Sequence, residues 1–292
     1  MSSETWTVKS ILAWIEGYLA DHGDPNPRLS AQWLVSDALG MSRIQLYTDF
    51  ARPLTLAERD VLRDYTRRRG TGEPLQYITG TTDFRFITVS VRPGVLIPRP
   101  ETEVLVSEAL ADVRMEDPFV LDLCTGTGCI ACAIATEFPN SRVVATDIDG
   151  KAVALARKNA DDLGVSERVE VLQCDLASGV DPHDVGHFDL LISNPPYIPT
   201  DVLESLEAQV SDFEPALALD GGDDGLDVFR RILPVATNQL ANAGVLAVEL
   251  HEECLDAAAA LAADAGFSNV RIARDLADRP RVLIASKGAK DE

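Results

Sequence analysis

Apolar side chains recur at helical spacing along the first 70 residues of the chain. The pattern covers residues 6–19, residues 29–39 and a third segment that begins at Thr55. Because residues three and four positions apart lie on one face of a helix, each segment predicts an amphipathic helix. Glu58 lies three residues after Thr55, which is the spacing of a capping box. The sequence therefore predicts a small helical domain at the N-terminus.

The third of these helices is expected to end in the run Arg67-Arg68-Arg69-Gly70. Basic side chains in the last turn of a helix interact favourably with its dipole. We interpret the arginines as a solvated helix end, with a docking patch for an acidic partner as the alternative.

The pattern changes after this region. Residues 71–74, Thr-Gly-Glu-Pro, are typical of a linker. Residues 84–91 alternate apolar and polar side chains, which predicts one strand that forms half of a hairpin. Pro98 and Pro100 then interrupt the chain before a helix expected over residues 101–113, with Pro100 near its first position.

Strands and helices are expected to alternate from residue 119 onward. Short apolar runs predict strands over 119–123, 142–146, 168–173, 189–193, 244–250 and 281–286. Helical spacing predicts helices over 130–138, 151–163, 226–240 and 255–265. This alternation is typical of a doubly wound α/β domain with a mostly parallel sheet.

The length of 292 residues suggests two domains. Charge is distributed unevenly along the chain. The net charge is −21, but residues 1–80 carry 10 acidic and 9 basic side chains, so about −20 falls on the remainder. An acidic catalytic region repels a phosphate backbone, which argues against a nucleic-acid substrate. Solubility or a salty habitat explains the acidity equally well.

Targeting and redox signals point to the cytoplasm. The first residues lack a basic and apolar leader, and no run approaches the about 18 apolar residues of a membrane span. Five cysteines form no even disulfide framework. Cys129-x-x-Cys132 has the spacing of a redox pair or half a zinc site, but no second such pair accompanies it. We therefore interpret both as packing residues and expect no metal.

A glycine-containing loop follows the first strand of the α/β region. Strand 119–123 leads into Cys124-Thr125-Gly126-Thr127-Gly128, and the two glycines allow a tight turn and a close approach of a ligand. Asp147 ends the next strand, 21 residues after Gly126, where a carboxylate can accept both ribose hydroxyls of a nucleoside. With Ala131, the loop also fits a dinucleotide dehydrogenase, and a plain strand-to-helix turn remains the alternative without a ligand.

The surroundings of the loop favour S-adenosylmethionine as the cofactor. The setting Asp122-x-x-x-Gly126-x-Gly128 resembles class I methyltransferases. The third strand ends in Cys174-Asp175-Leu176, where that class places an acid and an apolar residue around the adenine. Asp175 capping a turn is the alternative interpretation.

Asn194-Pro195-Pro196-Tyr197 directly follows an apolar strand and is the most specific chemical signal. Ligand sites in open α/β sheets lie beyond the carboxyl ends of the strands. Asn194 is expected at such an end, one strand away from the glycine loop. The prolines stiffen the turn and remove two backbone donors, so the segment presents acceptors. A tight turn without a catalytic role is the competing interpretation.

An amide nitrogen is a poor nucleophile because its lone pair is delocalised into the carbonyl. The side-chain oxygen of Asn194 and the carbonyl of Pro195 can each accept one hydrogen of a substrate –NH2, and Tyr197 offers a flat face against the planar amide. Positioning for in-line attack then supplies much of the rate, and no strong general base is obligatory. The same residues suit the exocyclic amine of adenine, so this motif alone leaves DNA, RNA and protein substrates open.

Several stretches together resemble the PrmC/HemK family of release factor glutamine methyltransferases, over nearly the whole chain. They are Glu73-Pro74-Leu75-Gln76-Tyr77-Ile78-Thr79-Gly80, Leu96-Ile97-Pro98-Arg99-Pro100-Glu101-Thr102-Glu103, the glycine loop, Asn194–Ile198, and Phe213–Leu219 with Gly221, Gly222, Asp224 and Gly225.

The resemblance implies a class I, Rossmann-like, seven-stranded methyltransferase domain preceded by a small helical domain and a short β-hairpin. The expected bounds are 1–72 for the helical substrate-recognition domain, 73–98 for the linker and hairpin, and 99–292 for the methyltransferase domain. It further implies a cytoplasmic monomer that methylates N5 of the glutamine in the Gly-Gly-Gln motif of class 1 peptide chain release factors. No direct nucleic-acid or membrane partner is expected.

Cys124 departs from the family pattern, which often has Gly at this position. Relatives that methylate a glutamine of a large-subunit ribosomal protein often have Cys there, but usually lack the Arg-Pro-Glu-Thr-Glu found here at residues 99–103. The release factor is therefore the favoured substrate and the ribosomal protein the alternative. An adenine-N6 methyltransferase, a dehydrogenase and a non-catalytic binding module are the other hypotheses, and titration with S-adenosylmethionine and with NAD separates these classes.

Overall fold

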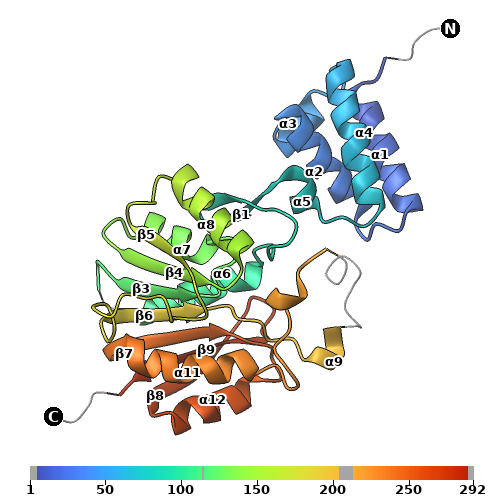
Figure 1. Cartoon of the computed structure of the whole chain (residues 1–292). Helices are drawn as coiled ribbons and strands as arrows, with labels where there is room; N and C mark the ends of the chain where they lie inside the picture. The colour runs from blue at the N-terminus through green and yellow to red at the C-terminus, as the bar shows by residue number, and fades with distance from the viewer. Residues whose placement is uncertain (1–4, 114, 204–212, 289–292) are drawn as a thin grey trace. The chain divides into compact units, whose positions relative to one another are not determined.

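A computed structural model describes residues 5–113, 115–203 and 213–288 of the chain. These residues divide into two compact units at Thr81/Thr82, and Phe213 belongs to the first unit. Helices make up the first unit, and a sheet with helices makes up the second (Figure 1). The domain bounds at residues 72 and 98 stay a prediction.

The described residues of the first unit form five helices. They are α1 (Val8–Asp21), α2 (Pro27–Leu39), α3 (Arg43–Thr48), α4 (Leu56–Gly70) and α5 (Leu75–Thr79). The side chain of Thr55 accepts a hydrogen bond from the Glu58 amide and completes the predicted capping box of α4. Two further boxes, Thr7 with Ser10 and Ser42 with Gln45, begin α1 and α3. Each box satisfies amide groups that the first helical turn leaves without partners.

Leucine, isoleucine and valine side chains fill the core of the first unit. Val8, Ile11, Ile15 and Leu19 form one stripe along α1 and are buried with residues of α2, α3, α4 and α5. Fully burying an aliphatic side chain contributes about 1.5–3 kcal/mol, so this stripe fixes the faces on which the helices pack.

The arginines at the end of α4 differ from one another in their surroundings. Arg67 is exposed beside Asp64, whereas Arg68 contacts Glu73 over 2.6 Å. Arg69 is buried, and its Nε donates to Asp24 Oδ2 over 2.6 Å. The interpretation of all three as a solvated helix end is therefore wrong for Arg69, because its counter-charge comes from a distant turn that helical spacing does not reveal.

The second unit is built on a seven-stranded sheet in the order β5-β4-β3-β6-β7-β9-β8. The strands are β3 (Phe119–Leu123), β4 (Arg142–Asp147), β5 (Val169–Gln173), β6 (Phe188–Ser193), β7 (Leu240–Glu249), β8 (Phe267–Arg274) and β9 (Pro280–Lys287). The first five run parallel, and β9 pairs antiparallel with both β7 and β8. The expected seven-stranded, mostly parallel α/β sheet is confirmed.

Helices cover both faces of this sheet (Figure 1). One face packs against α6 (Pro100–Asp112), α7 (Cys129–Glu137) and α8 (Gly150–Asp162), and the other against α11 (Asp227–Gln239) and α12 (Leu255–Asp264). Neighbouring residues of each strand serve opposite faces: Val120 lies in the first cluster and Leu121 in the second. Because both faces are buried, the strands have the continuous apolar sequences by which they were predicted.

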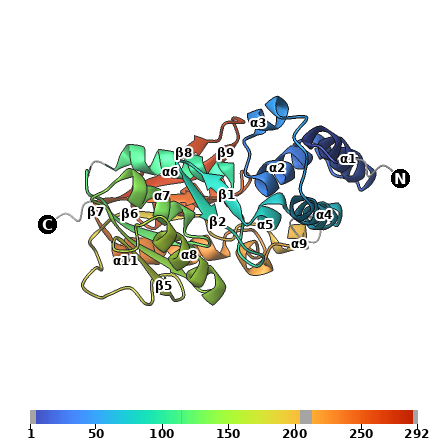
Figure 2. The same cartoon turned by 90° about the horizontal axis from the view of Figure 1, so that it is seen from above.

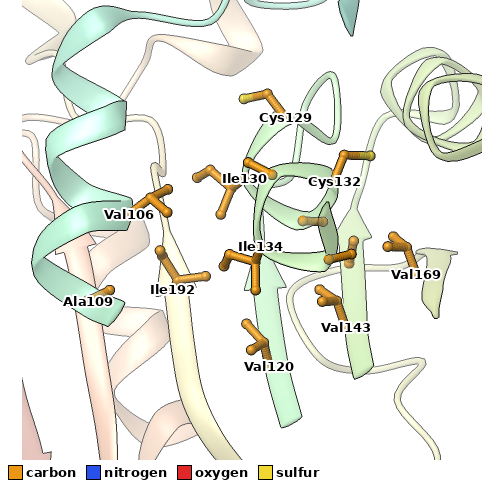
Figure 3. Packing of buried hydrophobic residues seen from close by; sticks show 14 of the residues in the cluster. Val106, Ala109, Val120, Cys129, Ile130, Cys132, Ile134, Val143, Val169 and Ile192 are labelled. Carbon is orange, nitrogen blue, oxygen red and sulfur yellow. The ribbon is translucent and has the colours of Figure 1, made fainter. Parts of the chain in front are cut away.

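The core between α7 and the sheet contains the two cysteines of the Cys-x-x-Cys pair. Ile130 and Ile134 lie on the side of α7 that faces Val106 and Ile192, as Figure 3 shows. Cys129 and Cys132 belong to the same buried cluster. Burial raises the pKa of each thiol to about 12, so both are protonated and weakly reactive, in agreement with a packing role.

A β-hairpin, β1 (Thr81–Phe84) and β2 (Ile87–Ser90), precedes the sheet and lies against α7 and α8 (Figure 2). The predicted hairpin is confirmed, with residues 87–90 as its second strand, but the expected start of that strand at Phe84 is wrong, because the chain turns at Arg85 with φ 51°. A left-handed residue other than glycine gives no turn signal in the sequence. Asn159 of α8 joins the hairpin by accepting from the Ser90 amide over 2.9 Å and donating to its carbonyl over 3.0 Å.

Several short elements lie outside the periodicity-based prediction. They are α3, α5, α9 (Thr200–Leu203) and the 3₁₀ turn η1 (Ala216–Ala218), together with the edge strand β8. Strand β7 begins at Leu240, directly after α11, rather than at Gly244. In the part of the chain that the structure covers, no helix combines the length and apolarity needed to cross a bilayer.

The buried Asp24–Arg69 pair is expected to hold the first unit together. Asp24→Asn leaves the Arg69 guanidinium buried without its counter-charge and should lower the free energy of unfolding by about 3–5 kcal/mol. Trp6, Trp14 and Trp33 are the three tryptophans of the chain and all lie in this unit, so urea titration followed by tryptophan fluorescence measures its unfolding.

Arg63→Ala is the matched control, because the Arg63–Asp60 pair is exposed at 68% for both side chains. An exposed pair contributes about 0–1 kcal/mol. Equal urea midpoints for Asp24→Asn and Arg63→Ala would show that the buried pair stabilises the unit no more than the exposed pair does.

Candidate active site

The site forms where the order of the parallel strands reverses. From β3 the chain adds β4 and β5 on one side, then returns to place β6 on the other. Leu123 and Ser193 are partners at the carboxyl ends of β3 and β6, and Ser193 Oγ donates to the Leu123 carbonyl over 2.8 Å. The glycine loop and Asn194 therefore leave the sheet side by side, at the position where open α/β sheets bind ligands.

Glycine is needed at the two positions of the loop for different structural reasons. Gly126 has φ 57°, and a Cβ built on it meets no atom within 4 Å, so its backbone borders open space. Gly128 has φ 77°, and a Cβ there lies 2.9 Å from the Cβ of Ala156 in α8. Gly126 thus allows a close approach from the cavity, whereas Gly128 allows the helices α7 and α8 to pack. Cys124 also has a positive φ, 59°, which explains why glycine suits this position.

Buried hydrogen bonds hold the loop in place. The Thr125 hydroxyl donates to Asp122 Oδ2 over 2.5 Å, and the Thr125 amide donates to the Thr146 carbonyl over 3.0 Å. Asn159 Nδ2, which also bonds the hairpin, donates to the Thr127 carbonyl over 2.8 Å. Burial raises the pKa of Asp122 to about 7. These contacts preorganise the loop before any ligand arrives.

Asp147 lies at the end of β4 beside the loop. Its Oδ2 accepts from the Gly126 amide and its Oδ1 from the Asp149 amide, each over 2.9 Å. Burial raises the pKa of this carboxyl, and the backbone donors oppose that effect. Each carboxylate oxygen has a further lone pair, so Asp147, held in place by the two amides, can still accept hydrogen bonds from two hydroxyl groups of a ligand.

One cavity brings together most of the residues that the sequence predicts as the site. Its walls include Cys124, Thr125, Gly126, Thr127, Asp147, Asp175, Leu176, Asn194 and Pro196. Pro195 is buried, and the walls include neither it nor Gly128 or Tyr197. The largely apolar walls, the open backbone at Gly126 and the fixed carboxylate of Asp147 fit a nucleoside-containing ligand with an apolar base and a ribose.

Asp175 and Leu176 border the cavity after β5. Arg231 of α11 donates to both oxygens of Asp175, over 2.7 and 2.6 Å, and both side chains are about half exposed. Leu176 has φ 47°, which turns the chain back along the wall of the cavity. Arg231 was absent from the sequence prediction, because nothing in an amphipathic helix marks one exposed arginine for this role.

Asn194 is oriented by a threonine of α6. Its Nδ2 donates to Thr102 Oγ1 over 3.0 Å. The Oδ1 atom is therefore the end of the side-chain amide that Asn194 offers to a ligand, and both Asn194 and Thr102 line the cavity. An acceptor at this position has the polarity that a substrate –NH2 requires.

Tyr197 points its hydroxyl toward the end of β7. The hydroxyl donates to Glu249 Oε1 over 3.3 Å, and burial raises the pKa of Tyr197. Glu249 is fully buried, and burial raises the pKa of its carboxyl to about 7. Sequence reasoning missed Glu249, since one acid within an apolar strand carries no periodic signal.

The segments quoted for the family resemblance form another wall of the cavity. Residues 94–99 line it, and so do Pro215, Leu217 and Ala218. Glu214 links the two segments by contacts to Ile97 and Arg99. The Ile97 amide donates to Glu214 Oε1 over 3.2 Å, and Arg99 forms a short ion pair with Glu214 Oε2. Burial raises the pKa of Glu214, while Arg99 opposes the effect. This pair explains why Arg99 and Glu214 occur within two of the recognised stretches.

Comparison with protein families identifies both parts of the chain. Residues 10–80 match the PrmC N-terminal domain, and residues 100–209 match the methyltransferase small domain. Among solved structures, a methyltransferase from Pyrococcus furiosus aligns with a TM-score of 0.52 at 22% identity, covering 68% of this chain and 88% of that one. A ribosomal protein L11 methylase from Lactobacillus delbrueckii subsp. bulgaricus aligns with a TM-score of 0.50 at 19% identity, covering 71% and 91%. At these identities the two structures show the fold alone.

Curated relatives are similar over most of the chain. The release factor glutamine methyltransferase of Geobacter sulfurreducens is 45% identical over 247 residues, covering 85% of both chains. That of Rhodopirellula baltica is 38% identical over 288 residues, covering 97% of both. With this extent of similarity, and with the loop, the Asp147 carboxylate and the Asn194 amide gathered at one cavity, the chain belongs to the family of release factor glutamine methyltransferases.

Proposed function

We propose that this chain transfers a methyl group from S-adenosylmethionine to N5 of the glutamine in the Gly-Gly-Gln motif of class 1 peptide chain release factors. The names of its relatives support the release factor as the substrate. The observation that carries the proposal is the orientation of Asn194, which offers its side-chain oxygen at the same cavity as the glycine loop.

The residues around Asn194 act by positioning. The Asn194 oxygen and the Pro195 carbonyl accept the two hydrogens of the glutamine –NH2, which holds the nitrogen on the line of attack. Tyr197, fixed by Glu249, supports the turn and presents its ring to the planar amide. S-adenosylmethionine supplies an electrophilic methyl group on a sulfonium. The bond between the methyl carbon and the sulfonium sulfur would break as the new N–C bond forms, leaving a neutral thioether. The nitrogen would lose one proton to solvent, so no strong general base would be needed.

The remaining cavity residues hold the cofactor. Asp147 accepts hydrogen bonds from the ribose hydroxyls of the cofactor. The open backbone of Gly126 lets the loop approach the methionine portion of the same molecule. Asp175 and Leu176 enclose the adenine, with Arg231 fixing the carboxylate of Asp175. Cys124, Thr125, Thr127 and Gly128 complete the loop.

The protein partner is recognised beyond its glutamine. We assign this role to the helical first unit, whose match to the PrmC N-terminal domain sets it apart from the catalytic part of the chain. A charge of about −20 beyond residue 80 is unsuited to direct binding of nucleic acid. We further propose that the enzyme acts as a monomer in the cytoplasm, where release factors work, and without a membrane partner.

Mass spectrometry tests the function directly. A purified class 1 release factor incubated with the chain and S-adenosylmethionine should gain one methyl group on the glutamine of its Gly-Gly-Gln motif. Omission of the cofactor is the control. An unmodified release factor, or methyl transfer to a ribosomal protein or to duplex DNA at low salt instead, would contradict the proposal.

Asp147→Ala should weaken binding of S-adenosylmethionine. Removing a charged partner of the ribose hydroxyls costs about 1.5–3 kcal/mol, and the backbone amides of Gly126 and Asp149 also lose their acceptor. Isothermal titration calorimetry measures the change. Asp162→Ala is the control, because Asp162 lies exposed on α8 and pairs with Lys158. Unchanged affinity in a folded Asp147→Ala variant would remove this residue from the site.

Asn194→Ala should lower the rate of methyl transfer to a release factor by about 10²-fold or more, as expected when a preorganised transition-state hydrogen bond is lost. Cofactor affinity should change far less. Asn194→Asp is the sharper variant, since it keeps the shape and an acceptor but adds a charge that binds the sulfonium in the ground state.

Single-turnover assays on a release factor measure both variants of Asn194. Asn140→Ala is the matched control, because Asn140 is exposed in the loop after α7. Transfer at the wild-type rate by Asn194→Ala would exclude the proposed contact between Asn194 and the substrate amide.

A further inference from the structure

The Asn194–Tyr197 turn contributes few groups to its own anchoring. Pro195 and Pro196 have no backbone N–H, so neither can donate a hydrogen bond that would hold the turn in place. The upstream end of the turn is fixed, because Ser193 is the last residue of β6 and pairs with β3. The position of the turn therefore depends on how the chain is held directly after Tyr197.

A second segment, residues 214–225, runs beside the chain that follows the turn, and we call this segment the clasp. Three backbone hydrogen bonds of 2.8–3.0 Å join the clasp to the residues after Tyr197. They run from the Ile198 amide to the Leu219 carbonyl, from the Gly221 amide to the Ile198 carbonyl, and from the Thr200 amide to the Gly222 carbonyl. The clasp thus supplies the downstream anchor that the prolines cannot provide.

Two buried glycines allow the clasp to lie directly against the backbone of Tyr197. A Cβ built on Gly221 would lie 2.7 Å from Tyr197 Cα, and a Cβ built on Gly225 would lie closer than 3.0 Å to the Tyr197 carbonyl oxygen. Both neighbours are backbone atoms, so no side chain can swing aside to make room. Because carbon atoms pack at about 3.5–4.0 Å, a Cβ at either position would push the two backbones apart by about 1 Å.

The clasp is itself anchored to the helices on both sides of the site. Glu214, at its start, is buried and forms an ion pair with Arg99, the residue directly before α6. Helix α6 carries the threonine that orients Asn194. Near the other end, the amide of Asp227 at the start of α11 donates to the Gly221 carbonyl over 2.9 Å. One segment therefore connects the helix that orients the Asn194 amide with the turn that carries it.

We infer that Gly221 and Gly225 are positioning residues for methyl transfer, because they let the clasp fix the downstream end of the Asn194–Tyr197 turn and with it the Pro195 carbonyl. The inference rests on the proposed function for its consequence in catalysis, whereas the clasp is a property of the chain alone. Neither glycine lines the cavity, so both act through the turn. A displacement of the turn by about 1 Å moves the acceptor carbonyl away from the substrate amide while leaving every chemical group in place.

Gly225→Ala should lower kcat on a release factor by about 10²-fold, as expected for a displacement of about 1 Å at the reacting groups. KM and the affinity for S-adenosylmethionine should change little, since the glycine loop and Asp147 stay in place. Gly221→Ala should show the same loss, at a residue outside the left-handed region.

Gly164→Ala is the matched control for Gly225→Ala. The φ of Gly164 is 69° and that of Gly225 is 75°, so an alanine carries similar backbone strain at both positions. A Cβ on Gly164 meets no atom within 4 Å, so only the variant of Gly225 displaces the turn. Equal kcat values for these two variants would overturn the inference.

A side-chain hydrogen bond across the clasp tests positioning without a steric clash. The Thr200 hydroxyl donates to Asp220 Oδ1 over 2.7 Å, and both residues are exposed. Thr200→Val removes this bond and should lower kcat about threefold to tenfold, whereas Thr200→Ser keeps the hydroxyl and should retain the wild-type rate. Thr88→Val is the matched control, because the exposed Thr88 hydroxyl donates to Asp83 Oδ1 of the β1–β2 hairpin, also over 2.7 Å. Equal kcat for Thr200→Val and Thr88→Val would contradict the role of the clasp.

Amide hydrogen exchange, measured by NMR without substrate, distinguishes this inference from the proposed function. The Ile198 and Thr200 amides should be protected in the wild type and exchange about tenfold faster in Gly225→Ala, whereas the amides of β6 should stay protected in both. Melting temperatures establish that each variant is folded, and Thr200→Val replaces Gly225→Ala if that variant unfolds. A wild type that leaves release factors unmethylated but shows this change in exchange refutes the substrate. A methylating wild type whose clasp variant keeps either the wild-type exchange or the wild-type kcat refutes the inference.

Discussion

The reversal of strand order between β3 and β6 is the constraint on which the site depends. Parallel strands deliver their carboxyl ends to one edge, and only at this reversal do two neighbouring ends leave a crevice that no connecting helix covers. The register Leu123 with Ser193, reinforced by the hydroxyl of Ser193, sets the glycine loop beside Asn194. A slip of one residue would turn each side chain to the opposite face and separate the two halves of the site.

Buried acids accompany this crevice at unusual density. Asp122 lies under the loop, Glu249 accepts from the Tyr197 hydroxyl and Glu214 lies behind the wall that contains Arg99. Each has a pKa raised by burial. Hydrophobic replacements would often be more stable, because desolvating a carboxyl costs several kcal/mol. A carboxylate, however, fixes the direction of every hydroxyl and amide around it. The site thus gains defined hydrogen-bond polarity at the expense of stability.

The sequence predicted what apolar periodicity encodes and little of what single polar contacts decide. Strands buried on both faces gave continuous apolar runs, so β3, β4 and β6 were found within a residue or two. The turn at Arg85 was missed because a left-handed arginine has no sequence signal, and β8 because an edge strand with few buried residues lacks alternation. The glycine loop and Asn194 were recognisable motifs, whereas Thr102 lies 92 residues before Asn194 and is paired with it only by the fold.

Methylation of an amide places a different demand on a protein than acid–base chemistry does. The nucleophile is already neutral, so a stronger base gains little, and rate depends on presenting acceptors to both hydrogens of a planar group. An asparagine side chain is nearly symmetrical in shape but opposite in polarity at its two ends, so packing cannot select its orientation. Selection must come from a hydrogen-bonding neighbour. Here the Thr102 hydroxyl oxygen accepts from Asn194 Nδ2, which leaves the Asn194 oxygen as the acceptor at the cavity.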